Sequence, residues 1–329
     1  MGKSASESPL QETREWATHR LLLLVVVAAV LAASALVGIA WSVGFGEALR
    51  RLAHPRWIWF LPAVGGELLA YLGYIAAYRE VARVEDGAEL AVSKAAALVA
   101  AGFGAFAHAG GFALDRAALQ RAGMSKREAG LRVRGLGALE YAALAPATMV
   151  AAILVVLWHP GVSTSLTLPW IIGVPVGALV ALTALCFRGP IKAWPMIGRS
   201  LAHSLESLSL VLTLMRSRRH GLATVGALAY WGGDIFCLWA MLRAFSAQTP
   251  PVAQLVVAYS TGYALTRRAL PLGGAGIVEA LLPFALGWLK IALAPALVAV
   301  FAYRLINLWL PIIPALAGLP SVHRLERPA

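Results

Sequence analysis

The stretch that decides the fold runs from Arg267 to Leu319 and reads RRALPLGGAGIVEALLPFALGWLKIALAPALVAVFAYRLINLWLPIIPALAGL. A proline at position 271 and glycines at 273, 274 and 276 interrupt an apolar region near its start. Non-helical backbone is tolerated at membrane depth only where protein buries it or where it lines a wet cavity, because lipid offers no hydrogen bonds. Glu279 follows one helical turn after the break, and Arg304 stands inside a second apolar run. Ionisable residues in apolar spans generally mark functional sites, so this stretch carries the first site hypothesis.

The composition of the whole chain excludes a soluble globular domain. Hydrophobic residues make up 60% of the 329 residues and charged residues only 13%. Several apolar runs reach the ~20 residues that a helix needs to cross a bilayer. We therefore expect an all-α, polytopic transmembrane helix bundle: a single domain over residues 21–319, with a cytoplasmic tail at residues 1–20 and a polar tail at residues 320–329. In such a chain the net charge of +12 fits basic loops facing anionic lipid, so we expect no nucleic-acid partner.

The residues around the glycine break resemble a family signature. LPLGGAGIVE at residues 270–279, followed by Tyr303-Arg304 in a Pro-containing helix, resembles the C-terminal signature of the lysylphosphatidylglycerol synthase transmembrane family. Members of that family are also described as flippase-like integral membrane proteins. The commonest signature is P-x-P-G-G-x-G-x-x-E and then Y-R, and Leu272 stands where a second proline is usual. The resemblance is specific for the C-terminal third of the chain.

This resemblance implies a role in moving or handling lipids with large polar heads. Phospholipids, aminoacylated phosphatidylglycerol, polyprenyl-linked sugars and hopanoid-like lipids belong to that class. In the best-known members, a bundle of this kind flips a lipid made by a separate synthase portion. We expect this chain, which lacks that portion, to be a stand-alone flippase-type transporter with a separate lipid synthase or glycosyltransferase as its partner.

Two other functions stay open at this point. One is a membrane-embedded enzyme that modifies a lipid head group, with Glu279 or Asp234 as general base. The other is an accessory subunit that scaffolds a lipid or glycan synthesis complex. The chain contains no G-x-S-x-G, no Walker A sequence and no H-E-x-x-H, so we expect no enzyme and no cofactor or metal. Cys186 and Cys237 lie within predicted spans and imply no disulfide framework.

The apolar segments give a provisional count of the membrane crossings. They cover residues 21–43, 57–78, 90–114, 136–157, 168–187, 222–242, 252–266, 270–289 and 293–319. Glycines interrupt the segments at 90–114 and 270–289. If the broken segments re-enter, the chain crosses about seven times, and if one of them spans, it crosses about eight times.

Basic residues indicate which side of the membrane the loops occupy. Six basic residues face two acidic ones between Asp115 and Arg134, and residues 188–219 form a second basic segment. The loops 115–134 and 188–219 are therefore expected in the cytoplasm of a plasma-membrane protein. Arg50, Arg51 and Arg56 precede the second span, which is unusual for an external loop.

The second basic segment also has a helical pattern. Leucine or methionine recurs at helical spacing, at Leu201, Leu205, Leu208, Leu212 and Met215. This pattern predicts a helix that either lies in the membrane interface or packs on the bundle.

The two ends of the chain show a coarse correspondence. In both 90–157 and 252–319 a short, Gly-interrupted segment is followed by a full span. Paired broken segments of this kind are typical of transporters built from inverted repeats, whose substrate site lies between the repeats. The similarity is one of pattern only.

The candidate site is electrostatic. Gly273, Gly274 and Gly276 let the backbone approach a ligand and leave N–H groups free at the start of the helix that carries Glu279, which suits a phosphate. Charge-assisted bonds to that phosphate would come from Arg267, Arg268 and Arg304. With Asp234, from the apolar middle of the 222–242 span, these are the predicted substrate-binding residues.

Each of these residues also has a structural interpretation. Arg267 and Arg268 could simply anchor the chain at the interface. Asp234, like Glu67 and Glu140, could be the partner of a basic residue within the bundle. An unpaired Arg304 near the bilayer midplane would cost ~2.5–3.5 kcal/mol. We therefore predict that Glu279 and Arg304 approach within hydrogen-bonding distance, next to the glycine break and bordering a polar cavity.

Overall fold

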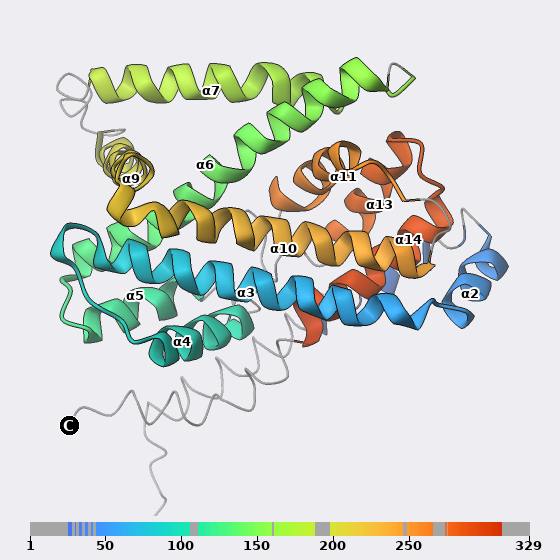
Figure 1. The fold of residues 1–329 in the computed structure, drawn as a ribbon, viewed down its shortest axis with the longest axis horizontal. Helices are drawn as coiled ribbons and strands as arrows, with labels where there is room; N and C mark the ends of the chain where they lie inside the picture. The colour runs from blue at the N-terminus through green and yellow to red at the C-terminus, as the bar shows by residue number, and fades with distance from the viewer. Residues whose placement is uncertain are drawn as a thin grey trace, which may run out of the picture.

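The computed structural model describes residues 44–105, 111–159, 161–187, 198–245, 249–265, 274 and 276–310, together with single positions between Val26 and Trp41. The elements in these residues are helices, without a strand, which confirms the all-α class (Figure 1). In chain order they are α2 (Phe45–Ala53), η1 (Trp57–Trp59), α3 (Phe60–Arg83), η2 (Val84–Asp86), α4 (Val92–Ala105), α5 (Gly111–Arg121), α6 (Lys126–Trp158), α7 (Leu168–Cys186), α9 (Gly198–Arg216), η4 (Arg218–His220), α10 (Gly221–Phe245), α11 (Val252–Tyr259), η5 (Ser260–Ala264), α13 (Val278–Trp288), α14 (Leu293–Arg304) and η7 (Leu305–Trp309).

Four described helices are long and apolar enough to cross a membrane. They cover Trp57–Arg83, Lys126–Trp158, Leu168–Cys186 and Arg218–Phe245. Each contains or matches a predicted span, at residues 57–78, 136–157, 168–187 and 222–242 respectively. Most of the predicted first span, at 21–43, lies outside the described residues, and its described positions are helical and exposed. The chain is therefore an integral membrane helix bundle.

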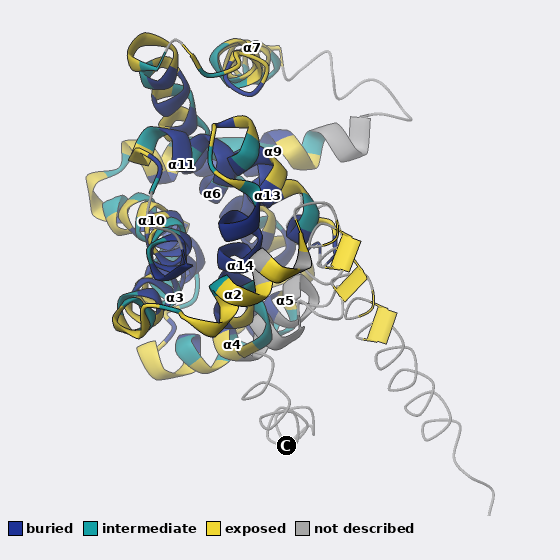
Figure 2. Ribbon diagram, turned by 90° about the vertical axis from the view of Figure 1, so that its right-hand side faces the viewer, coloured by how far each residue is buried: buried dark blue, intermediate teal, exposed yellow. Residues whose placement is uncertain are grey.

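The centre of the bundle is a closely packed pair of antiparallel helices, α3 and α10, which lie side by side in Figure 1. Glycines spaced seven residues apart face each other across this pair. A Cβ on Gly66 would lie 2.7 Å from the carbonyl oxygen of Gly233, and a Cβ on Gly73 would lie 2.6 Å from that of Gly226. Small residues at such spacing let membrane helices approach backbone to backbone. In Figure 2, both helices of this pair carry buried and exposed residues, whereas α7 is largely exposed and has no buried residue.

The glycine contacts predict a sharp difference between two glycines of α3. Gly73→Val would place side-chain atoms against the backbone of α10, since a Cβ there lies 2.5 Å from the amide nitrogen of Tyr230. Overpacking of this kind costs ~1–3 kcal/mol, so we expect a clear fall in the thermal unfolding midpoint of the protein in detergent. Gly65→Val is the matched control, because nothing lies within 4 Å of a Cβ at Gly65. Equal midpoints for the two variants would contradict this packing.

The Gly-interrupted segment 90–114, for which the sequence left a span and a re-entrant segment open, is not one continuous helix. It contains two helices that pack against each other: α4, with 14 residues, and α5, with 11. At ~1.5 Å per residue, neither covers ~30 Å of hydrocarbon. The second predicted broken segment, 270–289, also begins between helices. α11 and its continuation η5 end at Ala264, and α13 begins only at Val278. The connections at 106–110 and 266–273 lie outside the described residues.

The two pairs of short helices lie toward opposite ends of the bundle. In Figure 1, α4 and α5 lie at the end where α6 begins, and α11 and α13 lie toward the end where α14 begins. Each pair is followed by a helix that leads away from its own end, and contacts are made between α5 and α6 and between α13 and α14. This is the arrangement expected of inverted repeats, and it agrees with the correspondence between residues 90–157 and 252–319.

The second basic segment forms the predicted helix, α9, but with a different buried face. Leu205, Leu210 and Leu214 are buried, whereas Met215 of the predicted stripe is 45% exposed. Leu210 fills the space left by Gly135 on α6, because a Cβ there would lie 2.4 Å from its Cδ2 atom. The helix therefore packs on the bundle, with Leu205 of the predicted stripe buried, Leu208 and Leu212 half-buried and Met215 exposed.

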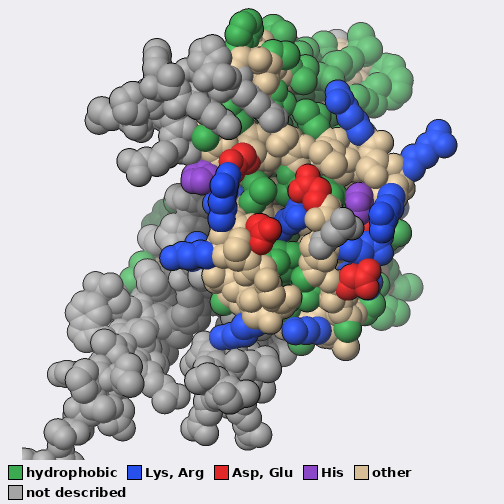
Figure 3. Space-filling view, turned by 90° about the vertical axis from the view of Figure 1, so that its left-hand side faces the viewer, with side chains coloured by type: hydrophobic (Ala, Val, Ile, Leu, Met, Phe, Trp, Pro, Cys, Tyr) green, Lys and Arg blue, Asp and Glu red, His purple; other side chains and the backbone are tan. Residues whose placement is uncertain are grey.

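One end of the bundle is strongly basic (Figure 3). Its exposed cations, from both predicted basic loops, are Arg116, Arg121, Lys126, Arg127, Arg134, Arg216, Arg218 and Arg219. The first of those loops, 115–134, is mostly helix, which corrects its interpretation as a loop. Only residues 122–125 separate α5 from α6, because Ser125 and Glu128 form a reciprocal capping box that starts α6 immediately. We refer to this end as the basic face.

Candidate functional site

Four charged side chains are buried together with polar ones between the apolar helices. Glu67 of α3, Asp234 of α10, Glu279 of α13 and Arg304 of α14 are exposed by 6%, 0%, 2% and 0%. Charges within a membrane bundle are costly and are retained where they pair or line a pathway. Sequence analysis selected Asp234, Glu279 and Arg304 as site residues and interpreted Glu67 as more structural.

Arg304 and Glu279 form the predicted ion pair. The Nε–H of Arg304 donates to Oε1 of Glu279 at 2.9 Å, which confirms the predicted contact. The Arg304 guanidinium also lies over the ring of Tyr263, with its Cζ atom 5.4 Å from the ring centroid. The side chains of Arg304 and Glu279 are exposed by only 1% and 2%. The polar cavity expected beside the pair stays a prediction.

The glycine break holds the carboxylate of this pair. Gly274 and Gly276 have φ angles of 71° and 85°, in the left-handed region that favours glycine. The N–H of Gly276 donates to Oε2 of Glu279 at 2.6 Å. The carboxylate of Glu279 therefore already occupies a position at the start of α13 where a ligand anion was predicted. A ligand would reach the Gly276 N–H only after Glu279 moves away.

Asp234 lies at the centre of a second cluster. Its Oδ2 accepts a hydrogen bond from the Tyr259 hydroxyl at 2.5 Å. Its Oδ1 accepts from the Tyr303 hydroxyl at 2.8 Å and from the Asn307 amide at 2.8 Å. Three donors from α11, α14 and η7 thus converge on one aspartate of α10. Charge-assisted bonds of this kind stabilise a carboxylate away from water.

Asn307 joins this cluster to its neighbours. Its amide nitrogen lies 3.4 Å from Oε2 of Glu67, and its amide oxygen accepts a hydrogen bond from the Tyr263 hydroxyl at 3.0 Å. Because Tyr263 also lies beneath Arg304, the acidic cluster and the ion pair form one continuous polar core. None of Asn307, Tyr259 and Tyr263 was among the site residues predicted from the sequence. The available signal was the pairing of polar residues four apart in apolar helices, Tyr259 with Tyr263 and Tyr303 with Asn307.

Irregular helix segments lie beside this core. Residues Ser260–Ala264 and Leu305–Trp309 form π-helical turns, a feature that often occurs at functional sites. Side chains of α6 bond to the first of these turns. The Tyr141 hydroxyl donates to the carbonyl of Ala264 at 2.7 Å, and the hydroxyls of Thr148 and Ser260 lie 2.7 Å apart.

A mainly apolar pocket of about 700 Å³ lies between α6 and α7, next to the first π-helical turn. Small side chains line much of it, and Tyr141 and Thr261 supply hydroxyl groups. The residues that line it are Ala138, Tyr141, Ala142, Ala145, Pro146, Ser165, Leu166, Pro169, Trp170, Gly173, Val174, Gly177, Ala178, Leu208, Thr261 and Leu265.

Three of the predicted site residues, Gly273, Arg267 and Arg268, lie outside the described residues. Glu140 is buried on α6, and its backbone carbonyl accepts a hydrogen bond from the Trp231 indole at 2.8 Å, which joins α6 to α10. Within the described ranges, no group of three or more His, Cys, Asp or Glu side chains could hold a metal ion.

Comparison with models of known protein families identifies a match. A family model described as "Lysylphosphatidylglycerol synthase TM region" matches residues 21–315. The match covers the described core, including the glycine break and the Arg304 helix, and extends far beyond the C-terminal third. No curated protein matches the chain.

Proposed function

Because the chain belongs to the lysylphosphatidylglycerol synthase transmembrane family, we propose that it moves a phosphate-bearing, polar-headed lipid between the two leaflets of a membrane. The observation that carries this proposal is the buried polar core with Arg304 and Glu279 paired at its edge. An intramembrane arginine is expensive, and lipid phosphate is the anion that a membrane supplies. A guanidinium suits that anion, because its planar donors bind phosphate and carboxylate in the same geometry.

The geometry supports an exchange of partners on Arg304. In the structure, the Glu279 carboxylate accepts one hydrogen bond from Arg304 and one from the Gly276 N–H. A lipid phosphate entering the core would compete for both donors, since each is suited to an anion. Proton uptake by the displaced Glu279 carboxylate would keep the buried charge constant. Glu279 thus acts in our proposal as the resident anion that the lipid head replaces.

The pocket between α6 and α7 supports a path for the lipid tail. It is mostly apolar and lies between two helices that are long enough to span the membrane. Its hydroxyl-bearing wall, Tyr141 and Thr261, belongs to the elements that flank the polar core. An acyl chain could remain in this pocket while its head group enters between the helices.

The test is transport by the purified protein in liposomes that contain a trace of fluorescent phosphatidylglycerol. An impermeant reductant bleaches only the outer leaflet, so empty liposomes should lose about half of the signal. Liposomes with the protein should lose nearly all of it. Parallel assays with fluorescent phosphatidylethanolamine and phosphatidylcholine compare head groups. Lipid recovered in a chemically changed form would favour the enzyme alternative, and no movement of any of these lipids would remove the flippase proposal.

We further propose that the basic face lies in the cytoplasm of a plasma-membrane protein. A cysteine at Ser163, in the α6–α7 loop, should react with an impermeant thiol reagent added to intact cells, and a cysteine at Ser125 should not. Both serines are exposed. The background should carry Cys186→Ser, because Cys186 is exposed whereas Cys237 is buried. External labelling at position 125 would show that the basic face lies outside the cell and would contradict the proposed orientation.

A further inference from the structure

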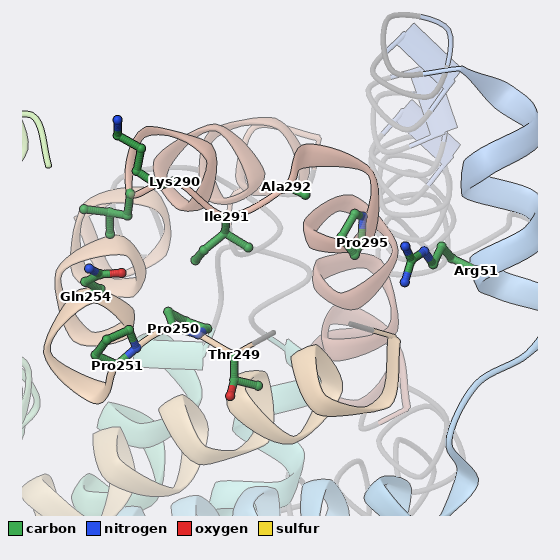
Figure 4. A pocket seen from close by; sticks show the side chains of 10 residues that line it. Arg51, Thr249, Pro250, Pro251, Gln254, Lys290, Ile291, Ala292 and Pro295 are labelled. Atoms are coloured by element: carbon green, nitrogen blue, oxygen red, sulfur yellow. The ribbon is translucent and has the colours of Figure 1, made fainter. Parts of the chain in front are cut away.

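A second pocket with basic residues in its lining lies at the end of the bundle opposite the basic face. It has a volume of about 360 Å³ and lies between α2, the start of α11 and the α13–α14 turn (Figure 4). Its lining residues are Arg51, Thr249, Pro250, Pro251, Gln254, Leu289, Lys290, Ile291, Ala292 and Pro295. Among these described lining residues are two cations and no acid. We propose that this pocket binds the phosphate group of a compact lipid head at the membrane surface.

Gln254 is the observation that points to a ligand. Its side chain is buried, with 7% exposure, and Figure 4 shows its amide directed from α11 into the space between the helices. Among the described residues, it has no hydrogen-bond partner. The amide of Gln254 lines the pocket. A ligand there would make the hydrogen bonds that no described protein group makes to this amide.

Two helix starts add positive potential to the same pocket. α11 follows Pro251 and α14 follows Ala292, and no side chain caps either helix. Both capping residues line the pocket. The first N–H groups of a helix and its dipole favour an anion, and here two such ends meet.

Arg51 supplies a full charge on the opposite side. Figure 4 shows its guanidinium reaching from α2 toward Pro295, while Lys290 lies at the rim with its ammonium group pointing away. Arginines at positions 50, 51 and 56 are unusual before a span that starts outside the cytoplasm. Binding of a phosphate by Arg51 gives one of them a function.

The size and position of the pocket define the ligand further. A volume of about 360 Å³ is at the lower end of the ~300–1,000 Å³ of small-molecule sites, which fits a phosphoglycerol-sized head and excludes a large oligosaccharide. Pro295 lines the pocket and Arg304 follows nine residues later, ~14 Å along the same helix. The pocket would thus hold the lipid head before or after its passage past Arg304, an inference that rests on the proposed function.

Direct binding tests this site in the full-length protein in nonionic detergent. Titration calorimetry with dihexanoylphosphatidylglycerol should show saturable binding. Gln254→Leu and Arg51→Ala should each raise the dissociation constant about tenfold, since each removes a donor to the phosphate. Arg50→Ala is the matched control, because Arg50 is the neighbouring residue of α2 and does not line the pocket. Its dissociation constant should stay within about twofold of the unmodified protein.

The same titration with glycerol 3-phosphate distinguishes a lipid from a free phosphate ester. If either probe binds, and if Gln254→Leu and Arg51→Ala weaken that binding, the result supports the phosphate site. Preference for the lipid probe assigns the lipid as the ligand. Absence of saturable binding, or equal binding by all variants with unchanged unfolding midpoints, would overturn it. The readout is independent of transport. A protein that binds the probe but moves no lipid in liposomes would refute the proposed function and leave this site in place.

Discussion

Replacing Arg304 by alanine should nearly abolish the yield of folded protein. Glu279 would keep a buried charge and lose the partner that now lies 2.9 Å away. Breaking a buried pair by removing one partner costs ~3–5 kcal/mol, a large part of the ~5–15 kcal/mol by which a typical protein is stable. Yield after size-exclusion chromatography and the thermal unfolding midpoint in detergent measure the effect. Arg243→Ala is the control, because the Arg243 guanidinium lies 5.2 Å from the ring centroid of Trp59 and its removal should cost less.

Exchanging the two charges separates a structural pair from a substrate site. Glu279→Arg combined with Arg304→Glu restores a buried ion pair, although an arginine at 279 cannot accept the Gly276 N–H. Yield should therefore recover in part. If Arg304 binds the lipid phosphate, transport in liposomes should stay at the level of empty liposomes. Recovery of transport together with yield would show that the pair is structural only, and full yield of Arg304→Ala alone would contradict the pair's role in stability.

The pairing of Arg304 with Glu279 could be predicted because its physics is local. Both charges stand in apolar runs, so each needed a partner, and they belong to consecutive helices. Consecutive helices usually pack as neighbours. The glycine break that precedes Glu279 could also be predicted, because glycine is the residue that favours left-handed φ angles, and two glycines of the break adopt them.

The Asp234 cluster could not be predicted in the same way. Asn307 contacts Asp234 across 73 residues and Glu67 across 240. Which helices meet is decided by the glycine contacts between α3 and α10, which bring Gly66 and Gly233 together beside Glu67 and Asp234. The seven-residue spacing of these glycines is visible in the sequence of each helix separately. Nothing in either helix alone identifies the other as its partner, because many apolar helices offer small residues at that spacing.

The boundaries of the helices and the faces that they bury could also be predicted only in part from the sequence. Periodicity correctly predicted a helix at α9, but leucines surround much of that helix, and Gly135 on α6 selects Leu210 for the interface. In the segment 90–114, the sequence left a span and a re-entrant segment open. The structure has two short helices there, ending at Ala105 and starting at Gly111. The apolar composition is the same for a crossing and for a hairpin, so only packing decides between them.

Gly276→Val should reduce lipid transport to the level of empty liposomes. Valine is strongly disfavoured at the φ angle of 85° that Gly276 adopts, so the turn would have to change. Its N–H would then no longer hold Glu279, which it now contacts at 2.6 Å. Gly274→Val, at a φ angle of 71°, should behave alike. Gly287→Ala in the following helix, α13, is the control, since the nearest atom to a Cβ there is 3.7 Å away and transport should be unchanged.

Replacing Gly276 by asparagine distinguishes two reasons for the glycine: the left-handed turn, and the close approach of the lipid head to the backbone. Asparagine tolerates the left-handed region, so Gly276→Asn should keep the turn and recover the yield of folded protein. If the lipid head must approach the backbone closely, the added side chain should still block transport, because it occupies the space that the phosphate would enter. Recovery of both yield and transport would mean that the left-handed turn alone matters. Near-normal transport by Gly276→Val itself would show that neither the turn nor the close approach serves lipid movement, and the exchange of partners on Arg304 would have to be abandoned.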